Sequence, residues 1–450
     1  MKGITEGRRA ALELLRAVER GRRLDVAWEE LAPRLPAAER PWVQEAAYGA
    51  VRFRGRLDHL LELHVDRGLE RLDPALLPIL RLGAYQLLHM DGVPSYAAVS
   101  QAVEQAREVR GGRVGGFVNA VLRALLREGC GEDRFPSLEE DPESHLTTWG
   151  SHPRWMVRRW LERYGVEDVR DLVAANNRVP STWFVPIGVE PHEAARRLGE
   201  AGIRSEAASD GSGALRLPPG TSPQAALGAA PGIVQDPAAR WVVLWTGDVA
   251  GRRSMDLCAA PGGKAVGLAG RGAQVVAADR SPGRLRRLRQ TADRLNLRIA
   301  CVAADAHRPP FRRGQSAEGE VVLVDAPCSG TGTLARHPDA RWRLTRETIS
   351  ELAEVQGRLL DGAAGIVRPG GLLVYSTCTL EPEENDSVVE AFLARHPEFI
   401  VEGGPAAPDA VRDGSILRIL PHVTGTDGSF AARLRRQTAG HEAPTLGRSR

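Results

Sequence analysis

Two cysteines stand a few residues after short apolar runs that have the length of buried strands. Cys328 follows the run Val321 to Asp325, and Cys378 follows Leu372 to Ser376. The carboxyl ends of strands in an open parallel sheet lie at one edge, where ligands bind. We therefore expect both thiols at one site. A cysteine thiolate can attack an electrophilic carbon and form a covalent intermediate, so this site could perform nucleophilic catalysis.

A loop of small residues follows another predicted strand, Ser254 to Cys258. Its predicted cofactor-binding positions are Cys258, Ala259, Ala260, Pro261, Gly262, Gly263 and Lys264. Small residues let the backbone approach a ligand closely, and N–H groups at the start of the next helix favour a carboxylate or phosphate. The loop lacks the G-x-G-x-x-G order of a dinucleotide fingerprint, and Ala265 follows Lys264 where a P-loop has Ser or Thr. NAD and ATP therefore fit poorly.

Three acidic residues are expected at the carboxyl ends of strands. Asp256 lies at the end of the first strand, before the small-residue loop, Asp279 ends the run Gln274 to Asp279, and Asp305 follows Arg298 to Ala303. A carboxylate at Asp279 can accept from ribose hydroxyls, and one at Asp305 can hold the exocyclic amine of adenine. With the small-residue loop, these acids predict an adenosine-type ligand with an anionic end, which S-adenosylmethionine satisfies. The alternative, that Asp279 and Asp305 are both helix N-caps, is the weaker interpretation.

The other cysteines do not suggest a metal or a disulfide. The five cysteines, at 130, 258, 301, 328 and 378, are odd in number, form no C-x-x-C pair and have no histidine at ligand spacing. Zinc and a disulfide framework are therefore not expected. We interpret Cys130 and Cys301 as small buried hydrophobes, and Cys258 as a small residue within the cofactor loop.

Strand and helix patterns alternate after Arg252, which predicts a doubly wound α/β domain with a mostly parallel sheet covered on both faces. Helical spacing of apolar residues from Arg8 to about Leu126 predicts six or seven helices. The stretch from Arg418 to Leu434 reads as a hairpin across Asp427-Gly428. We expect an all-helical domain at 1–130, a linker at 131–150, a small α+β subdomain at 151–245, the doubly wound domain at 246–436 and a disordered tail at 437–450.

Composition excludes several protein classes. The chain has 450 residues, 42% of them apolar, and its apolar runs are far shorter than the ~20 residues that cross a bilayer. No apolar segment follows the charged N-terminus, so a secretory signal is not expected and the cytoplasm is the expected location. The net charge of +3 is the balance of 60 basic and 57 acidic residues, and only two of the basic residues are lysine. This charge alone does not decide whether the protein binds nucleic acid.

Three motifs together resemble the RNA (cytosine-C5)-methyltransferases of the Sun/RsmB (Fmu) type. They are Asp256 to Lys264 (DLCAAPGGK), Asp325 to Gly332 (DAPCSGTG) and Tyr375 to Thr379 (YSTCT). The helical domain, with Phe117 to Arg123, is similar to the NusB-like RNA-binding domain that marks the rRNA branch of that family. The departures are small: Ala265 stands where a threonine is common, and Ser429 where an aromatic residue is common.

The resemblance implies a Rossmann-like class I methyltransferase domain that uses S-adenosylmethionine to methylate C5 of a cytosine in 16S rRNA. It assigns the thiolate that attacks C6 to Cys378, and assistance with release of the enzyme to Cys328. It places Asp325 beside both the donor and the cytosine N3/N4 edge. From the residues alone, the two cysteine roles are exchangeable.

A stacked, paired base cannot be attacked at C6, so the resemblance implies an RNA loop or a flipped nucleotide as substrate. We expect a monomer that binds RNA and neither DNA nor a membrane. The candidate phosphate contacts are Arg107, Arg110, Arg113, Arg154, Arg158 and Arg159. The alternatives are the same chemistry on tRNA or another rRNA, and a non-catalytic RNA-binding assembly factor. An NAD-dependent oxidoreductase is the weakest candidate.

Overall fold

The chain forms two compact units. The computed structural model describes residues 3–311 and 318–438. One unit comprises Met1–Val179 and Leu334–Arg343, and the other comprises Pro180–Thr333 and Leu344–Arg450. The chain thus enters the first unit a second time, directly after the segment that carries Cys328. Of the predicted tail at 437–450, the residues from 439 onward lie outside the described part.

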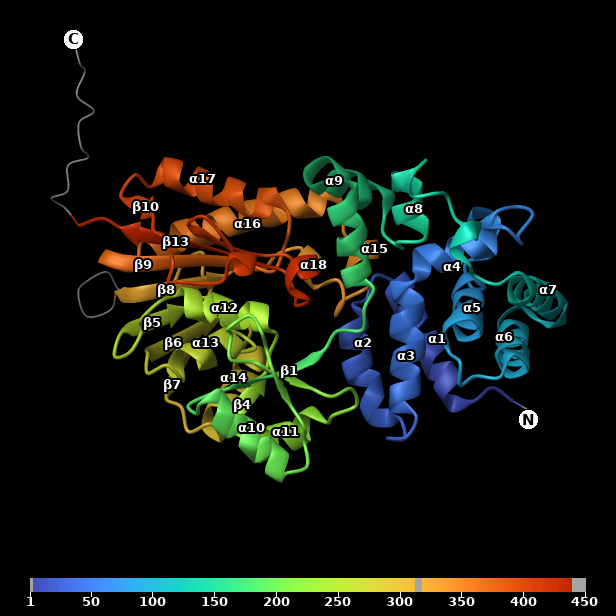
Figure 1. The fold of residues 1–450 in the computed structure, drawn as a ribbon, viewed down its shortest axis with the longest axis horizontal. Helices are drawn as coiled ribbons and strands as arrows, with labels where there is room; N and C mark the ends of the chain where they lie inside the picture. The colour runs from blue at the N-terminus through green and yellow to red at the C-terminus, as the bar shows by residue number, and fades with distance from the viewer. Residues whose placement is uncertain (1–2, 312–317, 439–450) are drawn as a thin grey trace, which may run out of the picture. The chain divides into compact units, whose positions relative to one another are not determined.

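The first unit is built from helices (Figure 1). In α4 (Arg54–Glu62), Leu57, Leu60 and Leu61 share one face and are fully buried. The predicted set of six or seven helices before residue 127 is confirmed, and the unit continues through 131–150, predicted as a linker, where α8 buries Leu146. Its other helices are α1 (Glu6–Glu19), α2 (Leu24–Leu31), α3 (Arg40–Arg52), α5 (Leu77–His89), α6 (Ser95–Arg110), α7 (Gly112–Glu128), α8 (Pro142–Thr148), α9 (Arg154–Asn176) and α15 (Ala340–Arg343).

Arg341 of α15 anchors the returning segment inside the first unit. Its side chain is fully buried, and its guanidinium donates to the backbone oxygens of Ser151 (3.1 Å) and Asn176 (3.0 Å). It also donates to Oδ1 of Asn177 at 2.7 Å and to the backbone oxygen of Leu334 at 3.3 Å. Burial lowers the pKa of Arg341. Neutral oxygens thus accept hydrogen bonds from both terminal nitrogens of this guanidinium.

The second unit begins with a small antiparallel sheet in the order β2-β3-β1-β4. Its strands are β1 (Thr182–Pro186), β2 (Glu206–Ala207), β3 (Leu215–Leu217) and β4 (Gly232–Val234), with helices α10 (Pro191–Glu200) and α11 (Pro223–Ala229). Phe184, Leu198 and Leu215 form part of its buried core. The predicted strands Thr182 to Val189 and Ala214 to Leu217 are confirmed with shorter bounds.

A nine-stranded sheet forms the body of the second unit, in the order β11-β12-β13-β9-β8-β5-β6-β7, with β10 paired to β13. The strands from β9 to β7 are parallel, and β13 runs antiparallel beside β9. The doubly wound, mostly parallel sheet is thus confirmed. The bounds are β5 (Arg253–Asp256), β6 (Gln274–Asp279), β7 (Ile299–Ala303), β8 (Gly319–Asp325), β9 (Val367–Thr377), β10 (Phe399–Val401), β11 (Arg412–Asp413), β12 (Ile416–Ile419) and β13 (Ser429–Arg436).

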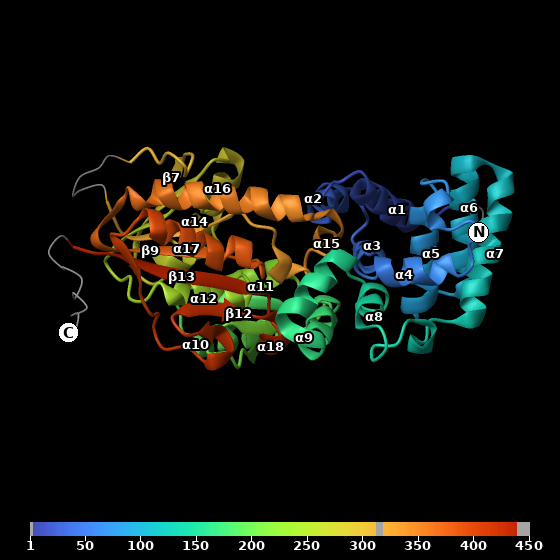
Figure 2. The same cartoon turned by 90° about the horizontal axis from the view of Figure 1, so that it is seen from above.

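Helices cover both faces of this sheet (Figures 1 and 2). On one face, Val242, Leu268 and Leu288 pack on strand residues such as Leu323. On the other face, Leu360 and Phe392 pack on residues such as Val322. This double cover explains why the parallel strands are continuous apolar runs. The helices of the first face are α12 (Pro237–Trp245), α13 (Gly263–Ala269) and α14 (Pro282–Arg294), and those of the second are α16 (Arg346–Ala364) and α17 (Asp386–Arg395).

The hairpin predicted across Asp427-Gly428 is correct in its pairing and wrong in its turn. Strands β12 and β13 are antiparallel neighbours, but α18 (Pro421–Thr424) lies in the connection between them. Gly428 is not in a positive-φ turn conformation. Its backbone N–H donates to the oxygen of Gly332 at 2.7 Å. The glycine is therefore required for close contact between two backbones.

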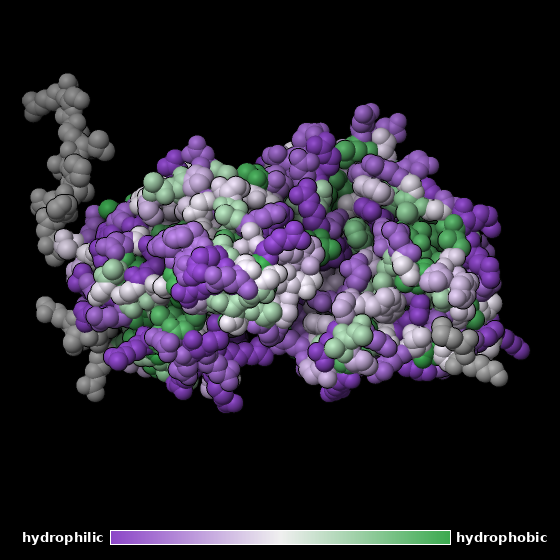
Figure 3. Space-filling view, turned by 60° about the horizontal axis from the view of Figure 1, so that its bottom comes forward, coloured by the Kyte–Doolittle hydropathy of each residue, from purple (hydrophilic) through white to green (hydrophobic). Residues whose placement is uncertain are grey.

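The surface contains both hydrophilic and hydrophobic side chains. On the face seen in Figure 3, hydrophilic side chains surround smaller hydrophobic groups. Across residues 3–311 and 318–438, no helix has the length and apolar character that a membrane crossing requires.

Candidate active site

The two predicted catalytic cysteines meet at the carboxyl edge of the large sheet. Strands β8 and β9 are parallel neighbours, with Asp325 in register with Ser376, so the loops that follow them lie together. The Cys328 and Cys378 sulfur atoms are 3.3 Å apart, and the backbone N–H of Cys378 donates to the Cys328 sulfur at 3.3 Å. Two residues fifty positions apart in the chain thus present one pair of thiols.

The environment of Cys328 favours its neutral thiol. The hydrogen bond with Cys378 raises the pKa of Cys328, and burial and the nearby carboxylate of Glu384 raise it further. At neutral pH this residue therefore holds a proton. A protonated thiol is a weak nucleophile and can donate a hydrogen bond.

Asp325 lies beside the thiols and is held by two side chains. Its Oδ2 accepts from Lys264 Nζ at 2.7 Å, and its Oδ1 accepts from the Ser376 hydroxyl at 2.8 Å. Burial alone would lower the pKa of Lys264, but the contact with Asp325 outweighs burial and raises it. Lys264 is therefore an ammonium at neutral pH. The Asp325 side chain remains 32% exposed, which leaves it accessible to a ligand.

The small-residue loop after β5 adopts a conformation that demands glycine at one position. Gly262 has φ +119°, and a Cβ there would come within 2.6 Å of Leu288 on α14. A side chain from the end of β6 also holds the loop, because Asp279 accepts a hydrogen bond from the backbone N–H of Ala260 at 3.1 Å. The guanidinium of Arg284 donates to the Ala260 carbonyl oxygen. This loop is therefore rigidly placed next to the end of β6.

A cavity of about 410 Å³ opens over this loop. Ala259 to Lys264 form one wall together with Asp325, and Gln235 and Arg294 contribute polar groups. The cavity thus brings together two of the predicted features, the loop after β5 and the acid at the end of β8. Cys258, the first residue of the predicted cofactor loop, does not line the cavity; it is partly buried, and burial raises the pKa of its thiol.

The other two predicted acids differ in their surroundings. Asp279 is buried and also accepts from the Ser281 backbone at 2.8 Å, so its carboxylate is partly engaged by the protein. Asp305 is 66% exposed, and its Oδ1 accepts from the backbone and the ring of His307. The hydrogen bond from the His307 backbone lowers the pKa of Asp305. Both carboxylates can accept further hydrogen bonds.

Most of the arginines predicted to contact phosphate are paired with acidic side chains. Arg107 contacts Glu104 at 2.7 Å, and Arg110 contacts Asp73. Arg154 and Arg158 share one carboxylate, that of Glu143, at 3.0 and 2.9 Å. These pairs are exposed, so each contributes little to stability and can exchange its acid for another anion.

The roles of several residues around the site depend on tertiary contacts. Arg284 has the spacing of an exposed helix face, but its guanidinium reaches the cofactor loop. Ser376 contacts Asp325, and Glu384 and Gln356 hold the backbone on either side of Cys328. Ser376 lies inside the Tyr375 to Thr379 motif, but neither its contact with Asp325 nor the support from Glu384 and Gln356 follows from spacing along the chain. Only tertiary contacts identify these roles.

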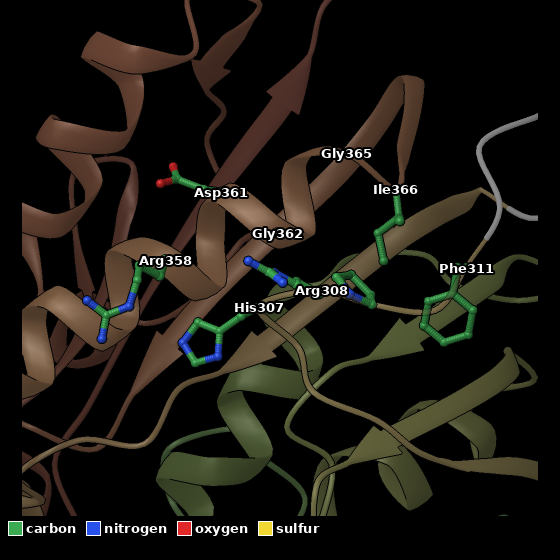
Figure 4. A pocket seen from close by; sticks show the side chains of 9 residues that line it. His307, Arg308, Phe311, Arg358, Asp361, Gly362, Gly365 and Ile366 are labelled. Carbon is green, nitrogen blue, oxygen red and sulfur yellow. The ribbon is translucent and has the colours of Figure 1, made fainter.

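A larger cavity lies elsewhere in the second unit. It has a volume of about 490 Å³ and lies between the segment after β7 and the end of α16 (Figure 4). Its lining includes His307, Arg308, Phe311 and Ile366, and none of the predicted catalytic or cofactor-binding residues. It is therefore separate from the thiol site.

Family models match three parts of the chain. The model described as 16S rRNA methyltransferase RsmB/F matches residues 246–435, the NusB family model matches residues 5–127, and the RsmF/B-like ferredoxin-like domain model matches residues 152–222.

Relatives that align over most of this chain are named as small-subunit rRNA methyltransferases. The chain is 33% identical over 435 residues to ribosomal RNA small subunit methyltransferase B of Vibrio vulnificus, which covers 95% of this chain and 98% of the relative. It is 32% identical over 410 residues to the probable enzyme of that name from Bacillus subtilis, covering 87% and 90%. Among solved structures, PH0851 matches with a TM-score of 0.76 and 25% identity, over 95% of this chain and 98% of that one. NSun6 of Pyrococcus horikoshii has the same fold over 63% of this chain and 98% of its own, with a TM-score of 0.53 and 18% identity.

Proposed function

Because the chain belongs to the RsmB/F family of S-adenosylmethionine-dependent 16S rRNA methyltransferases, we propose that it methylates C5 of one cytosine through a covalent bond between Cys378 and C6. The observation that carries this proposal is the contact of two thiols beside the cavity over the cofactor loop. One thiol can attack while the other stays protonated. If the two thiols served only to fill space, their contact beside the cavity would have no explanation.

Cytosine C5 is too weak a nucleophile to take a methyl group directly. Attack of the Cys378 thiolate on C6 forms an S–C6 bond and moves the ring electrons toward C5 and N3, so that C5 becomes enamine-like. C5 then accepts the methyl group. Loss of the C5 proton and cleavage of the S–C6 bond return the thiolate and release 5-methylcytosine.

Asp325 would stabilise the adduct at the pyrimidine edge. Its carboxylate is partly exposed and lies in the cavity wall, which supports contact with the N3/N4 edge of the base. When Cys378 adds to C6, negative charge develops at N3, and a proton that Asp325 shares with N3 would neutralise that charge and lower the barrier. Lys264 and Ser376 hold Asp325 in place through hydrogen bonds of 2.7 and 2.8 Å.

Cys328 would assist release of the methylated base. Its thiol is neutral at physiological pH and touches Cys378, so it can donate to the departing sulfur. The raised pKa of Cys328 also argues against its use as the attacking group. The raised pKa of Cys328 therefore favours the roles that the family resemblance implies, with Cys378 as the attacking group and Cys328 assisting release.

The cofactor would supply an electrophilic methyl group when bound. We infer that Cys258 to Lys264 line its methionine end, since the loop walls the cavity next to Asp325. Asp279 and Asp305 stand at successive strand ends and fit the ribose hydroxyls and the adenine amine respectively. The match between these acids and an adenosine ligand supports the assignment.

The substrate would be an unpaired or flipped cytosine in 16S rRNA. Access to C6 from above the ring requires a base outside its stack. The NusB-type region, in which Arg107 and Arg110 form exposed ion pairs that can exchange partners, supports a role in holding RNA. We infer a monomer that acts in the cytoplasm, where rRNA is available, without DNA or membrane partners.

The test is to incubate the protein with labelled S-adenosylmethionine and unmodified 16S rRNA, in parallel with Cys378→Ala and Cys328→Ala. We expect label in 5-methylcytidine from the unaltered protein, no label from Cys378→Ala, and a covalent RNA complex from Cys328→Ala on a denaturing gel. The reverse pattern for the two variants would exchange the cysteine roles. Label only in tRNA or another rRNA would change the substrate, and donor binding without label in any RNA would favour an assembly factor.

A further inference from the structure

A buried carboxylate holds the backbone that carries Cys328. Glu384 ends the 3-10 turn η5 (Pro382–Glu384), and its side chain is fully buried. Its Oε1 accepts from the backbone N–H of Ser329 at 2.8 Å, and its Oε2 accepts from the hydroxyl of the same residue. Because Ser329 is the residue after Cys328, both hydrogen bonds restrain the cysteine.

Gln356 completes the support from the other side. It lies on α16, is fully buried, and donates from Nε2 to Glu384 Oε1 at 2.9 Å. The same nitrogen donates to the carbonyl oxygen of Pro327 at 3.0 Å. The residues on both sides of Cys328 are thus connected to one carboxylate, directly or through one amide.

Hydroxyl groups tie this support to the loop of the second thiol. The Ser329 hydroxyl contacts Thr379 Oγ1 at 2.8 Å, and Thr331 Oγ1 contacts the same atom at 3.0 Å. Thr331 Oγ1 also accepts from the backbone N–H of Leu380 at 2.9 Å. Thr379 and Leu380 directly follow Cys378. A change at Glu384 is therefore transmitted to the distance between the two sulfur atoms.

We propose that Glu384 is a positioning residue that sets the Cys328 thiol against Cys378 and so controls release of the methylated base. The proposal rests on the proposed function, in which Cys328 assists release. Loss of a charge-assisted hydrogen bond to a buried group slows a dependent step by roughly 10-fold to 100-fold. The nearby negative charge also supports the proton on the Cys328 thiol.

The principal variant is Glu384→Gln, which keeps shape and removes charge. Its matched control is Glu354→Gln on α16, whose side chain is 76% exposed. With unmodified 16S rRNA and S-adenosylmethionine, we expect Glu384→Gln to bind donor normally and to form the covalent RNA complex. We expect release of methylated RNA to be slower by roughly 10-fold to 100-fold, so that the complex accumulates on a denaturing gel.

A second readout needs no RNA and no donor. Diamide takes two electrons from two thiols, so that two S–H bonds break, one S–S bond forms and diamide is reduced to its hydrazine. We expect the Cys328–Cys378 disulfide to form at least about tenfold more slowly in Glu384→Gln than in Glu354→Gln, measured by mass spectrometry of alkylated peptides. If the unaltered protein makes no 5-methylcytidine but this rate still falls, the proposed function fails and the positioning role stands.

Ser329→Ala keeps the backbone N–H and removes only the hydroxyl, so it gives a smaller effect in the same direction. In the double variant Glu384→Gln/Ser329→Ala, the fold-decrease in each rate should be smaller than the product of the two single fold-decreases, because the two residues act through one contact. Equal cross-linking and release rates in Glu384→Gln and Glu354→Gln would overturn the proposal. So would a parallel loss of donor binding, cross-linking and melting temperature. If Glu384→Gln does not fold, unchanged release and cross-linking in Ser329→Ala overturns the proposal.

Discussion

Lys264 Nζ donates a 2.7 Å hydrogen bond to Asp325 Oδ2 and so joins the loop after β5 to the end of β8. The two side chains are 15% and 32% exposed. Water therefore screens their attraction only in part. This contact places the one described lysine among residues 3–311 and 318–438 at the meeting point of the cofactor loop and the thiols.

Replacing Lys264 with methionine keeps the apolar stem and removes the charge. The Asp325 carboxylate would then be half-buried without its cation, so we expect the free energy of unfolding to fall by about 2 kcal/mol. We also expect methylation to slow, because Asp325 loses its fixed position. Urea unfolding and single-turnover methylation measure the two effects. Arg286→Met on the exposed side of α14 is the control, and equal values for the two variants would contradict the expectation.

Gly332→Ala should damage the site through backbone contact alone. A Cβ at this position would lie 2.8 Å from the Cys378 carbonyl oxygen and 2.8 Å from the Cα of Gly428. Backbone atoms cannot give way as a side-chain end does, so the Cys378 loop must shift. We expect single-turnover methylation to fall by about 100-fold while donor binding by calorimetry changes little. Gly283→Ala in α14, where the added Cβ meets nothing within 4 Å, should retain full activity.

Arg341→Met should loosen the segment that returns to the first unit. The variant leaves the backbone oxygens of Ser151, Asn176 and Leu334 without this donor inside a buried site. Unsatisfied buried acceptors cost about 1–3 kcal/mol each. We expect faster amide hydrogen exchange at 334–343 and at 151–177, with Arg346→Met as the exposed control. Unchanged exchange at both segments would show that other contacts hold the segment.

Glu402→Gln should give a pH-dependent loss of stability. Hydrogen bonds from Arg435 and Arg433 lower the pKa of Glu402 to about 2. Its carboxylate therefore stabilises the folded state above the unfolded pKa of about 4.3, and this contribution disappears as the pH falls through 2.

We expect Glu402→Gln to lower the free energy of unfolding by about 2 kcal/mol at pH 7, and the difference from the unaltered protein to shrink between pH 4 and pH 2. Urea titrations at several pH values measure it. Glu390→Gln, at an exposed position of α17, should show no such trend. A difference that persists undiminished at pH 2 would rule out the ion pair as its cause.

Sequence patterns predicted the strands of the large sheet well. Gln274–Asp279 forms a strand with the predicted bounds, and the runs around Val321 and Leu372 form β8 and β9. Parallel strands covered on both faces must be apolar along their length, so the pattern survives in the sequence. The fold class followed from the same alternation of strands and helices.

Other features depend on contacts between distant residues. Asp427-Gly428 has the composition of a hairpin turn, yet Gly428 packs on Gly332, almost a hundred positions away. Arg284 has the spacing of an exposed helix face, yet its long side chain reaches Ala260. In both cases local spacing is compatible with two environments, and packing selects one.

The sequence by itself determined the fold class, the family and the residues that carry the chemistry, because buried strands, small-residue loops and the cysteine motifs depend on local composition. Only the tertiary structure decided that Cys328 and Cys378 touch, that Lys264 pairs with Asp325, and that Glu384 supports the Cys328 backbone. It also decided that 334–343 packs in the helical unit. The physical reason is that hydrogen bonds and charge pairs act over a few ångströms in space and leave no periodic pattern along the chain.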